Sequence, residues 1–323
     1  MLGGVIKGTI SRVESKDYYV IPEGLKNPVR CSLRGKFKND FNLKKDKLFK
    51  VDIAVVGDWV EYELNNDGTG VIHEISDRKN YLSRKAPKLK GVGYRGERLE
   101  QVIASNVDNL FIVNSVKDPV FNNKVVDRII VAGESSHLKI ILLINKVDLG
   151  LTEEINKFIE LYESLGYKVL LTCAKFGTGL EDIKKELKGK KNIFWGHSGV
   201  GKSSILNSLY PDLNLKTAEI SKSTSKGRHT TVTSLLMEVE ENTFIIDTPG
   251  VREIDPYGIT KENLSHYFIE FQPHMKDCRF NTCTHFHEPD CGVTGAVDKE
   301  LISYERYESY LNILETIEDD MVF

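Results

Sequence analysis

The sequence predicts a multidomain protein whose 323 residues fall into three parts of different fold class. Short strands separated by turn residues fill residues 1–75 and predict a small closed β-barrel. Between 98 and 255, apolar strands alternate with amphipathic helices, which predicts an α/β domain on a parallel sheet. Between 256 and 323, cysteine and histidine at metal-ligand spacing predict a small, mainly helical or irregular metal-binding domain.

The N-terminal part predicts a five-stranded barrel of the oligonucleotide-binding (OB) type. Gly, Asn, Asp and Pro separate candidate strands at 5–13, 18–21, 29–34, 59–64 and 69–75. The long loop between the third and fourth strands contains Lys36, Phe37, Lys38, Phe41, Lys44, Lys45, Lys47, Phe49 and Lys50. Exposed aromatic rings among lysines would stack on nucleic-acid bases, whereas rings turned inward would fill the barrel. Both alternatives stay open at this stage.

The net charge of -3 hides an uneven distribution of charge along the chain. Residues 30–50 contain eight Lys or Arg and two Asp, and residues 78–98 contain eight Lys or Arg and one Glu. From 256 onward there are thirteen Asp or Glu and five Lys or Arg. The basic stretches suit a polyanion such as RNA, or they form solvated loops. We interpret 76–97 as a basic linker without regular structure.

Composition also limits the cellular setting. No run of about eighteen apolar residues occurs, so no transmembrane helix and no membrane partner are expected. The N-terminus lacks the apolar run of a signal peptide. We therefore expect a cytoplasmic protein. As a separate expectation, we take it to be a monomer. Three of the five cysteines lie within fourteen residues, a spacing that indicates a metal site in place of disulfides.

Residues 196–203 have the spacing Gly-x4-Gly-Lys-Ser of a phosphate-binding loop. An apolar segment, 192–195, precedes the loop and predicts a strand, and helical spacing follows over 204–209. Lys202 would reach the β- and γ-phosphates of a nucleotide, and the Ser203 hydroxyl would bind Mg2+. The other residues expected to bind phosphate are Gly196, His197, Ser198, Gly199, Val200, Gly201 and Ser204. The alternative is a coincidental glycine turn.

Asn145, Lys146 and Asp148 follow the strongly apolar segment 139–144 and predict a guanine site. The Asp148 carboxylate can accept hydrogen bonds from guanine N1–H and the 2-amino group, whereas adenine would leave it unpaired. Asn145 would brace the loop, and Lys146 would cover the base. The alternative is a simple turn with Asp148 as a helix cap.

A second guanine-binding segment, 172–175, follows a predicted strand at 168–171. The Ala174 backbone N–H could donate to guanine O6, with Lys175 beside it. Cys173 is interpreted as a small core residue. Helical spacing over 124–132 and 153–165 completes the first half of the α/β domain.

Residues 216–233 are rich in Ser, Thr and Lys, and we interpret them as a loop that orders on a γ-phosphate. Thr230 or Thr231 would complete the Mg2+ shell, and we favour Thr231. Strands predicted at 234–240 and 243–246 lead into Asp247, which suits Mg2+ through water. The Gly250 N–H suits the γ-phosphate. Together these residues predict the switching parts of a GTPase.

The order of these motifs is unusual. Ordinary small GTPases begin with the phosphate loop, but here both guanine motifs precede it. Joining the old termini and opening new ones gives the same sheet, so the order indicates a circular permutation. The segment from 247 to about 255 then leads directly into the C-terminal domain. We expect that nucleotide state could move that domain.

The C-terminal segment contains the pattern Cys278-x4-Cys283-x-His285-x5-Cys291. Three thiolates and one imidazole form a closed tetrahedral set, which is typical of one structural Zn2+. His287 is the rival imidazole, and buried cysteines without metal are the alternative. The surrounding sequence is polar, so we expect the metal to supply folding energy in place of a core. A final helix is predicted over 303–317.

The permuted order, the cysteine pattern and the segment Lys-Gly-Arg-His-Thr-Thr at 226–231 resemble the RsgA family of ribosome small subunit biogenesis GTPases. The resemblance covers nearly the whole chain, including 33–37 and 57–60. It implies binding to the small ribosomal subunit and its rRNA, assistance in late maturation, and ribosome-stimulated hydrolysis of GTP to GDP. Cys173 stands where many relatives have Ser.

The resemblance also implies a catalytic role for His229. Val251 follows Gly250 and cannot orient water as the Gln of Ras-like enzymes does, whereas a neutral imidazole can accept a hydrogen bond from water. The alternative is an ordinary surface histidine. Two other functions stay open: an RNA-binding scaffold that holds nucleotide for stability, and a GTPase that serves another RNA such as tRNA.

Overall fold

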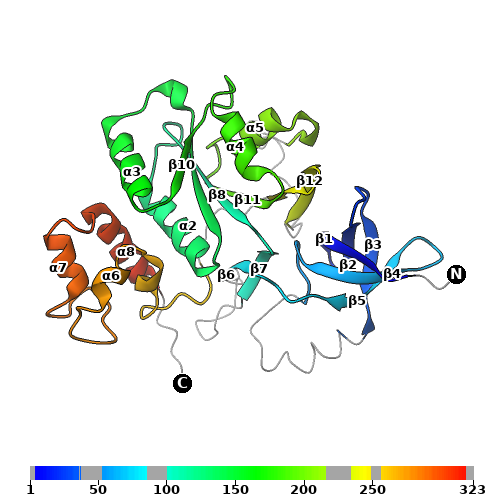
Figure 1. Ribbon diagram of the computed structural model, residues 1–323, viewed down its shortest axis with the longest axis horizontal. Coiled ribbons are helices and arrows are strands. Elements are labelled where there is room, and N and C mark those ends of the chain that lie inside the picture. Colours follow the sequence, from blue (N-terminus) through cyan, green and yellow to red (C-terminus); the bar gives the residue numbers. More distant parts are fainter. Residues whose placement is uncertain are drawn as a thin grey trace, which may run out of the picture.

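The computed structural model describes residues 4–35, 37, 53–85, 100–215, 234–248 and 256–317. Three parts lie in a row, with a small barrel at one end, an α/β domain in the middle and a helical domain at the other end (Figure 1). The predicted fold class is therefore confirmed. Among the described residues, no helix combines the length and apolarity needed to span a membrane.

Five strands form the N-terminal barrel: β1 (Ile6–Glu14), β2 (Asp17–Pro22), β3 (Val29–Leu33), β4 (Trp59–Leu64) and β5 (Gly70–Ile75). They pair in the order β1-β2-β3-β5-β4, and a β1–β4 pairing closes the sheet. The β3–β5 pair is parallel and the others are antiparallel. This closure confirms the OB-type barrel, in which alternate side chains such as Ile10, Val20 and Ile72 fill the interior.

Phe37 bears on the two alternatives for the aromatic loop. Its side chain is half-buried and packs against the apolar core of the barrel. For this ring the structure favours filling of the barrel over base stacking. Phe41, Phe49 and the lysines from 36 to 50 lie outside the described residues.

The central domain contains the strands β8 (Asn109–Ser115), β9 (Lys139–Asn145), β10 (Lys168–Leu171), β11 (Lys191–Trp195), β12 (Leu235–Glu240) and β13 (Thr243–Asp247). The order across the sheet is β10-β9-β8-β11-β13-β12, and only the β12–β13 pair is antiparallel. Although β11 is fourth of these strands along the chain, it lies between β8 and β13 at the centre. This placement is what the predicted circular permutation requires.

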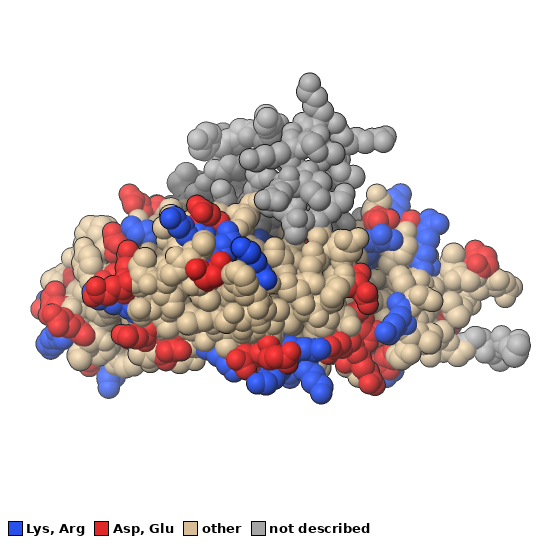
Figure 2. All heavy atoms as spheres, turned by 90° about the horizontal axis from the view of Figure 1, so that it is seen from above, with Lys and Arg blue, Asp and Glu red and all other residues tan. Residues whose placement is uncertain are grey.

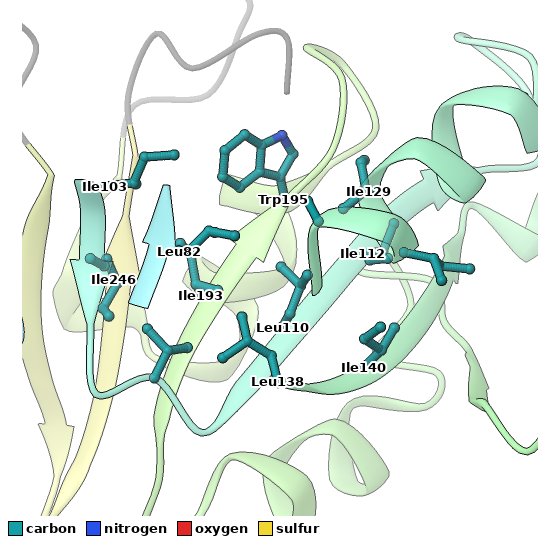
Figure 3. Packing of buried hydrophobic residues seen from close by; sticks show 14 of the residues in the cluster. Leu82, Ile103, Leu110, Ile112, Ile129, Leu138, Ile140, Ile193, Trp195 and Ile246 are labelled. Carbon is teal, nitrogen blue, oxygen red and sulfur yellow. The ribbon is translucent and has the colours of Figure 1, made fainter. Parts of the chain in front are cut away.

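Helices cover both faces of this sheet: α2 (Asn123–Ser135), α3 (Glu153–Ser164), α4 (Leu180–Leu187) and α5 (Lys202–Leu209). On one face, Leu110, Ile112, Ile193 and Trp195 pack against α2 residues such as Ile129 (Figure 3). On the other face, Phe111 stacks on Phe194 with ring centroids 4.7 Å apart, beneath α4 and α5. Burial on both faces explains why these strands are continuous apolar runs.

The predicted linker, 76–97, was expected to lack regular structure, but it contains a strand. Strand β6 (Tyr81–Lys85) pairs antiparallel with β7 (Glu100–Ser105) in a separate two-stranded sheet. The sequence of β6 is polar and basic, so its composition gave no strand signal. It forms because the more apolar β7 supplies backbone partners, and Leu82 is fully buried in the core beside Ile103 and Ala104.

A buried polar junction joins the barrel to the central domain. The Asp58 carboxylate is fully buried and accepts hydrogen bonds from Arg78 (2.7 and 2.9 Å), the Ser105 hydroxyl (2.6 Å) and the Val55 N–H (2.8 Å). Lys191 at the start of β11 donates to the Gly57 carbonyl at 3.0 Å, and burial lowers its pKa to about 8. Strand β1 also pairs with β12, which makes one continuous sheet.

The C-terminal domain is mainly helical, with η4 (Leu264–Tyr267), α6 (Gln272–Met275), α7 (Gly292–Asp298) and α8 (Tyr304–Thr316). Helix α8 lies against α2 of the central domain (Figure 1). Phe268, Phe271 and Tyr310 form a buried aromatic core, to which Val131 of α2 contributes. The expectation of little core here was wrong, because the apolar residues are spread along the chain and gather only in the fold.

Candidate nucleotide and metal sites

The predicted nucleotide-binding residues lie at one edge of the central sheet. Because β9, β10, β11 and β13 are parallel, their carboxyl ends meet at the same edge. Asn145 ends β9 and Asp247 ends β13, while the glycine loop follows Trp195 of β11. Ligands of open α/β sheets bind at this edge.

The glycine loop has a backbone that other residues cannot adopt without strain. Gly196, Gly199 and Gly201 have φ angles of +156°, +88° and +99°. A Cβ atom at Gly196 would lie 2.1 Å from the Val113 carbonyl oxygen, and one at Gly201 would lie 2.2 Å from Asn145 Nδ2. The glycines therefore let the loop pass close to β8 and β9 before α5 begins at Lys202.

Lys202 folds back over this loop. Its Nζ donates to the carbonyl oxygens of Gly196 at 2.6 Å and His197 at 3.0 Å. Burial lowers the pKa of Lys202, and the nearby Asp247 carboxylate acts in the opposite direction. Burial likewise raises the pKa of Asp247, against the effect of Lys202. A phosphate group would add to the negative charge of Asp247 and further offset the burial of this ammonium.

Asn145 connects the loop after β9 to the glycine loop and to the loop at 172–175. Its side chain is 2% exposed, its Nδ2 donates to the Val200 carbonyl at 2.9 Å, and its Oδ1 accepts from the Ala174 N–H at 3.3 Å. The bracing position expected for Asn145 agrees with this geometry. The Ala174 N–H, however, points at Asn145 here, where the sequence predicted a bond to the base.

Lys146 and Lys175 lie on the loops that flank this site. The Lys146 backbone is left-handed, with φ +63°, and its Nζ donates to the Asp118 carbonyl. The Lys175 ammonium lies 5.0 Å from the ring centroid of the exposed Phe176. Lys146 therefore also holds the 115–121 loop, a contact that the sequence did not suggest.

Cys173 contacts Asp148, which sequence reasoning missed. The Cys173 side chain is 2% exposed, as a core residue should be, but its thiol donates to Asp148 Oδ1 at 3.0 Å. Asp148 lies in the short 3-10 helix η1 (Val147–Leu149). The signal that the sequence offered was the resemblance noted above, in which Cys173 takes the place of a Ser hydroxyl donor.

Some of the remaining predicted site residues lie in the described part of the chain, and others lie outside it. Ser203 and Ser204 lie in the first turn of α5, next to Lys202. His197, Ser198 and Gly199 are exposed in the glycine loop, whereas Val200 is buried. The predicted residues His229, Thr230, Thr231 and Gly250 lie outside the described part of the chain.

Cys278, Cys283, His285 and Cys291 come together in the C-terminal domain, with their ligand atoms within 4.8 Å of one another. Cys278 Sγ lies 3.8 Å from Cys291 Sγ, and His285 Nδ1 lies 3.5 and 3.4 Å from these two sulfur atoms. With Zn–S bonds of about 2.3 Å and a Zn–N bond of about 2.0 Å, a tetrahedral site would place two sulfur atoms about 3.8 Å apart. It would place a sulfur atom and the nitrogen atom about 3.5 Å apart. The cluster therefore fits Zn2+. His287 is exposed on the Phe286 ring and is no member of the cluster.

Hydrogen bonds fix the loop that carries His285. The Glu288 carboxylate accepts from the Thr284 N–H and hydroxyl, both at 2.7 Å, and from the Phe286 N–H at 3.0 Å. Although burial acts in the other direction, these bonds lower the pKa of Glu288 to about 2. The loop therefore has a defined shape that includes the left-handed His285 backbone, with φ +56°.

Comparison with known proteins agrees with this geometry. Residues 75–257 match the family profile described as RsgA GTPase, and residues 7–72 match the RsgA N-terminal domain. The chain is 38% identical over 322 residues to small ribosomal subunit biogenesis GTPase RsgA 2 of Bacteroides thetaiotaomicron, covering 99% of this chain and 98% of the relative. It is 36% identical to RsgA of Chlorobaculum tepidum, covering 97% and 98%.

Two solved structures share the whole fold. YjeQ from Thermotoga maritima superposes with a TM-score of 0.73 at 33% identity, over 97% of this chain and 98% of that one. YloQ, described as a circularly permuted GTPase, gives a TM-score of 0.71 at 28% identity, over 99% and 97%. Similarity of this extent includes the barrel, the permuted domain and the cysteine-rich domain. The chain belongs to the RsgA family of circularly permuted GTPases.

Proposed function

We propose that this protein hydrolyses GTP to GDP and assists late maturation of the small ribosomal subunit. The observation that carries the proposal is the meeting of the glycine loop, Lys202, Asp148 and Asp247 at one sheet edge in permuted order. The names of the relatives, small ribosomal subunit biogenesis GTPase, supply the ribosomal partner. A cytoplasmic monomer is the form in which we expect it to act.

Asp148 would select guanine. Its carboxylate would accept from N1–H and the 2-amino group, while its other contact, the Cys173 thiol, holds its orientation. Asn145 supports the proposal, because it ties this loop to the phosphate loop and thus fixes the distance between base and phosphates. Lys146, Ala174 and Lys175 would line the remaining edges of the base.

The phosphates would lie on the loop from 196 to 204. Lys202, which in this structure donates to two loop carbonyls, would turn to the β- and γ-phosphates when nucleotide binds. Ser203, Thr231 and Asp247 would hold Mg2+, which would neutralise charge on the phosphate oxygens. The Gly250 N–H would bind the γ-phosphate, and His229 would accept a hydrogen bond from the attacking water.

The Cys3His cluster would hold one structural Zn2+. Four protein ligands leave no open position for water or substrate, so the ion would stabilise the domain and take no part in hydrolysis. His285 would bind through Nδ1, the ring nitrogen that faces the sulfur atoms.

The rRNA contact would extend over several parts of the molecule. On the face in Figure 2, the described Lys and Arg side chains are interspersed with Asp and Glu and form no single basic patch. The basic segments 36–50 and 86–98 lie largely outside the described residues, and we propose that they supply much of the contact with the phosphate backbone.

Steady-state GTP hydrolysis tests the proposal. The purified protein is assayed alone, with small ribosomal subunits, and with large subunits as the control. We expect slow turnover alone and strong stimulation by small subunits only. Tight GTP binding without stimulation by either subunit would contradict the proposed role and favour a nucleotide-holding scaffold.

A further inference from the structure

Helix α8 contacts two segments that are far apart in the sequence, and it does so through neighbouring residues. Arg306 faces α2 of the GTPase domain, whereas Tyr307 and Tyr310 face the loop that carries His285. The three residues lie within a little more than one turn of the same helix. A shift of that turn would therefore change both contacts together.

The contact with the GTPase domain is a buried network of charges. Arg306 is 1% exposed, and its guanidinium donates to Asp127 of α2 at 2.5 Å and to Glu270 at 2.6 Å. Tyr162 of α3 donates to the same Asp127 carboxylate at 2.8 Å. Buried ion pairs of this kind are stable only when every partner is in place, so the network sets one position of α8 on α2.

The contact with the metal loop is equally specific. The Tyr307 hydroxyl donates to the His285 carbonyl at 2.7 Å, and the Tyr310 hydroxyl donates to the Thr284 carbonyl at 2.5 Å. The Phe271 ring lies edge-on to the His285 ring, with centroids 6.2 Å apart, and also packs on Tyr310. Since Phe271 follows Glu270 directly, a second short route joins the charge network to the ligand loop.

We propose that metal binding by the Cys3His cluster and docking of α8 on α2 are one coupled equilibrium. The ion fixes the loop, the carbonyls of Thr284 and His285 hold Tyr310 and Tyr307, and these keep Arg306 aligned with Asp127. The proposal rests on the Zn2+ proposed above and adds a consequence: the metal holds the C-terminal domain in place on the GTPase domain. Coupling of this kind is reciprocal, because each event stabilises the other by the same factor.

Metal release is the first test. Zinc content of the purified full-length protein is measured at the start, because a protein that neither contains zinc nor takes it up would overturn both the proposed metal and the coupling. Release into a chromophoric chelator is then followed. We expect Arg306→Met and Asp127→Asn to release zinc on the order of tenfold faster than wild type, an effect typical of lost support around metal ligands.

A matched control lies at the same interface. Lys124→Met removes an exposed pair between α2 and α8, Lys124 Nζ to Glu308 Oε1 at 3.2 Å, and should leave the release rate unchanged. GDP binding by each variant shows that its GTPase domain is folded. Release from both Arg306→Met and Asp127→Asn at the wild-type rate would overturn the coupling.

The reciprocal experiment needs only the wild-type protein. After zinc removal, amide hydrogen exchange is compared with that of the loaded protein across the GTPase domain. We expect faster exchange in α2, at 123–135, and unchanged exchange in α5, which lies on the opposite face of the sheet. Unchanged exchange in α2 after complete zinc removal would overturn the proposal even if the Arg306 and Asp127 variants failed to fold.

Discussion

At the scale of single residues, the contact between Cys173 and Asp148 is the clearest addition to what the motifs implied. A thiol is a weak donor, but here it is buried and directed at a carboxylate. It thereby fixes the orientation of the one side chain expected to distinguish guanine from adenine. A residue that composition assigns to the core thus supports the proposed base-binding site.

This contact predicts the effect of two substitutions. Cys173→Ala should weaken GDP binding about tenfold, because a hydrogen bond to a charged group contributes about 1.5–3 kcal/mol and the thiol lies near the lower limit. Cys173→Ser should retain wild-type affinity, since a hydroxyl can donate in the same place. Titration calorimetry with GDP measures both, and Cys31→Ala in the barrel core is the control. Wild-type affinity in Cys173→Ala would show that the thiol is dispensable.

At the scale of elements, the phosphate loop shows how two strands restrict a turn. The loop passes close to the carboxyl ends of β8 and β9, where Asn145 Nδ2 occupies the space in which a Cβ of residue 201 would lie. The same Asn145 amide donates to the Val200 carbonyl, so steric contact and hydrogen bonding act on one short segment. The shape of the loop therefore depends on β9 as much as on its own glycines.

Gly201→Ala tests this dependence. The new methyl group would displace Asn145, so we expect GDP affinity to fall more than tenfold. This loss of affinity comes in addition to the conformational cost of about 1–2 kcal/mol for an alanine with a left-handed backbone. Gly166→Ala is a matched control, because Gly166 has a similar φ of +87° but no atom near its Cβ position. The control should lose some stability and keep its affinity for GDP. Equal affinities in the two variants would mean that the displaced amide does not matter.

At the scale of the whole molecule, two buried charge networks hold the outer domains on the central one. Asp58 joins the barrel to the central domain through Arg78 and Ser105, and Arg306 joins the C-terminal domain through Asp127. The expected route from the nucleotide to the C-terminal domain, through 249–255, lies outside the described residues. The described contacts between these domains are made by α2, which packs against α8 and η4.

The barrel junction predicts a large loss of stability for one substitution. Asp58→Ala would remove the fully buried carboxylate that accepts hydrogen bonds from Arg78, the Ser105 hydroxyl and the Val55 N–H, and removing one partner of a buried pair costs about 3–5 kcal/mol. Asp17→Ala, which removes an exposed pair with Arg30 in the same barrel, should have no measurable effect. Urea unfolding followed by tryptophan fluorescence compares the two. Similar unfolding midpoints would argue against a stabilising role for the junction.

The sequence by itself determined the fold class, the permuted order of the motifs and the metal-ligand set. These features depend on local spacing: glycines around a turn, apolar runs of strand length, and cysteines a few residues apart. By spacing, His285 was the preferred ligand and His287 was its rival. Only the loop held by Glu288 turned His285 inward and left His287 exposed.

The tertiary structure alone decided what joins the parts. Arg306 and Asp127 are 179 residues apart in the chain, and Cys173 and Asp148 are 25 apart. Strand β6 forms although its own composition is polar, because β7 provides its backbone partners. Such contacts depend on how distant segments pack, and a local pattern contains no record of its distant partner. The motifs therefore predicted the chemistry of this protein, whereas the contacts that position its residues and dock its domains had to be observed.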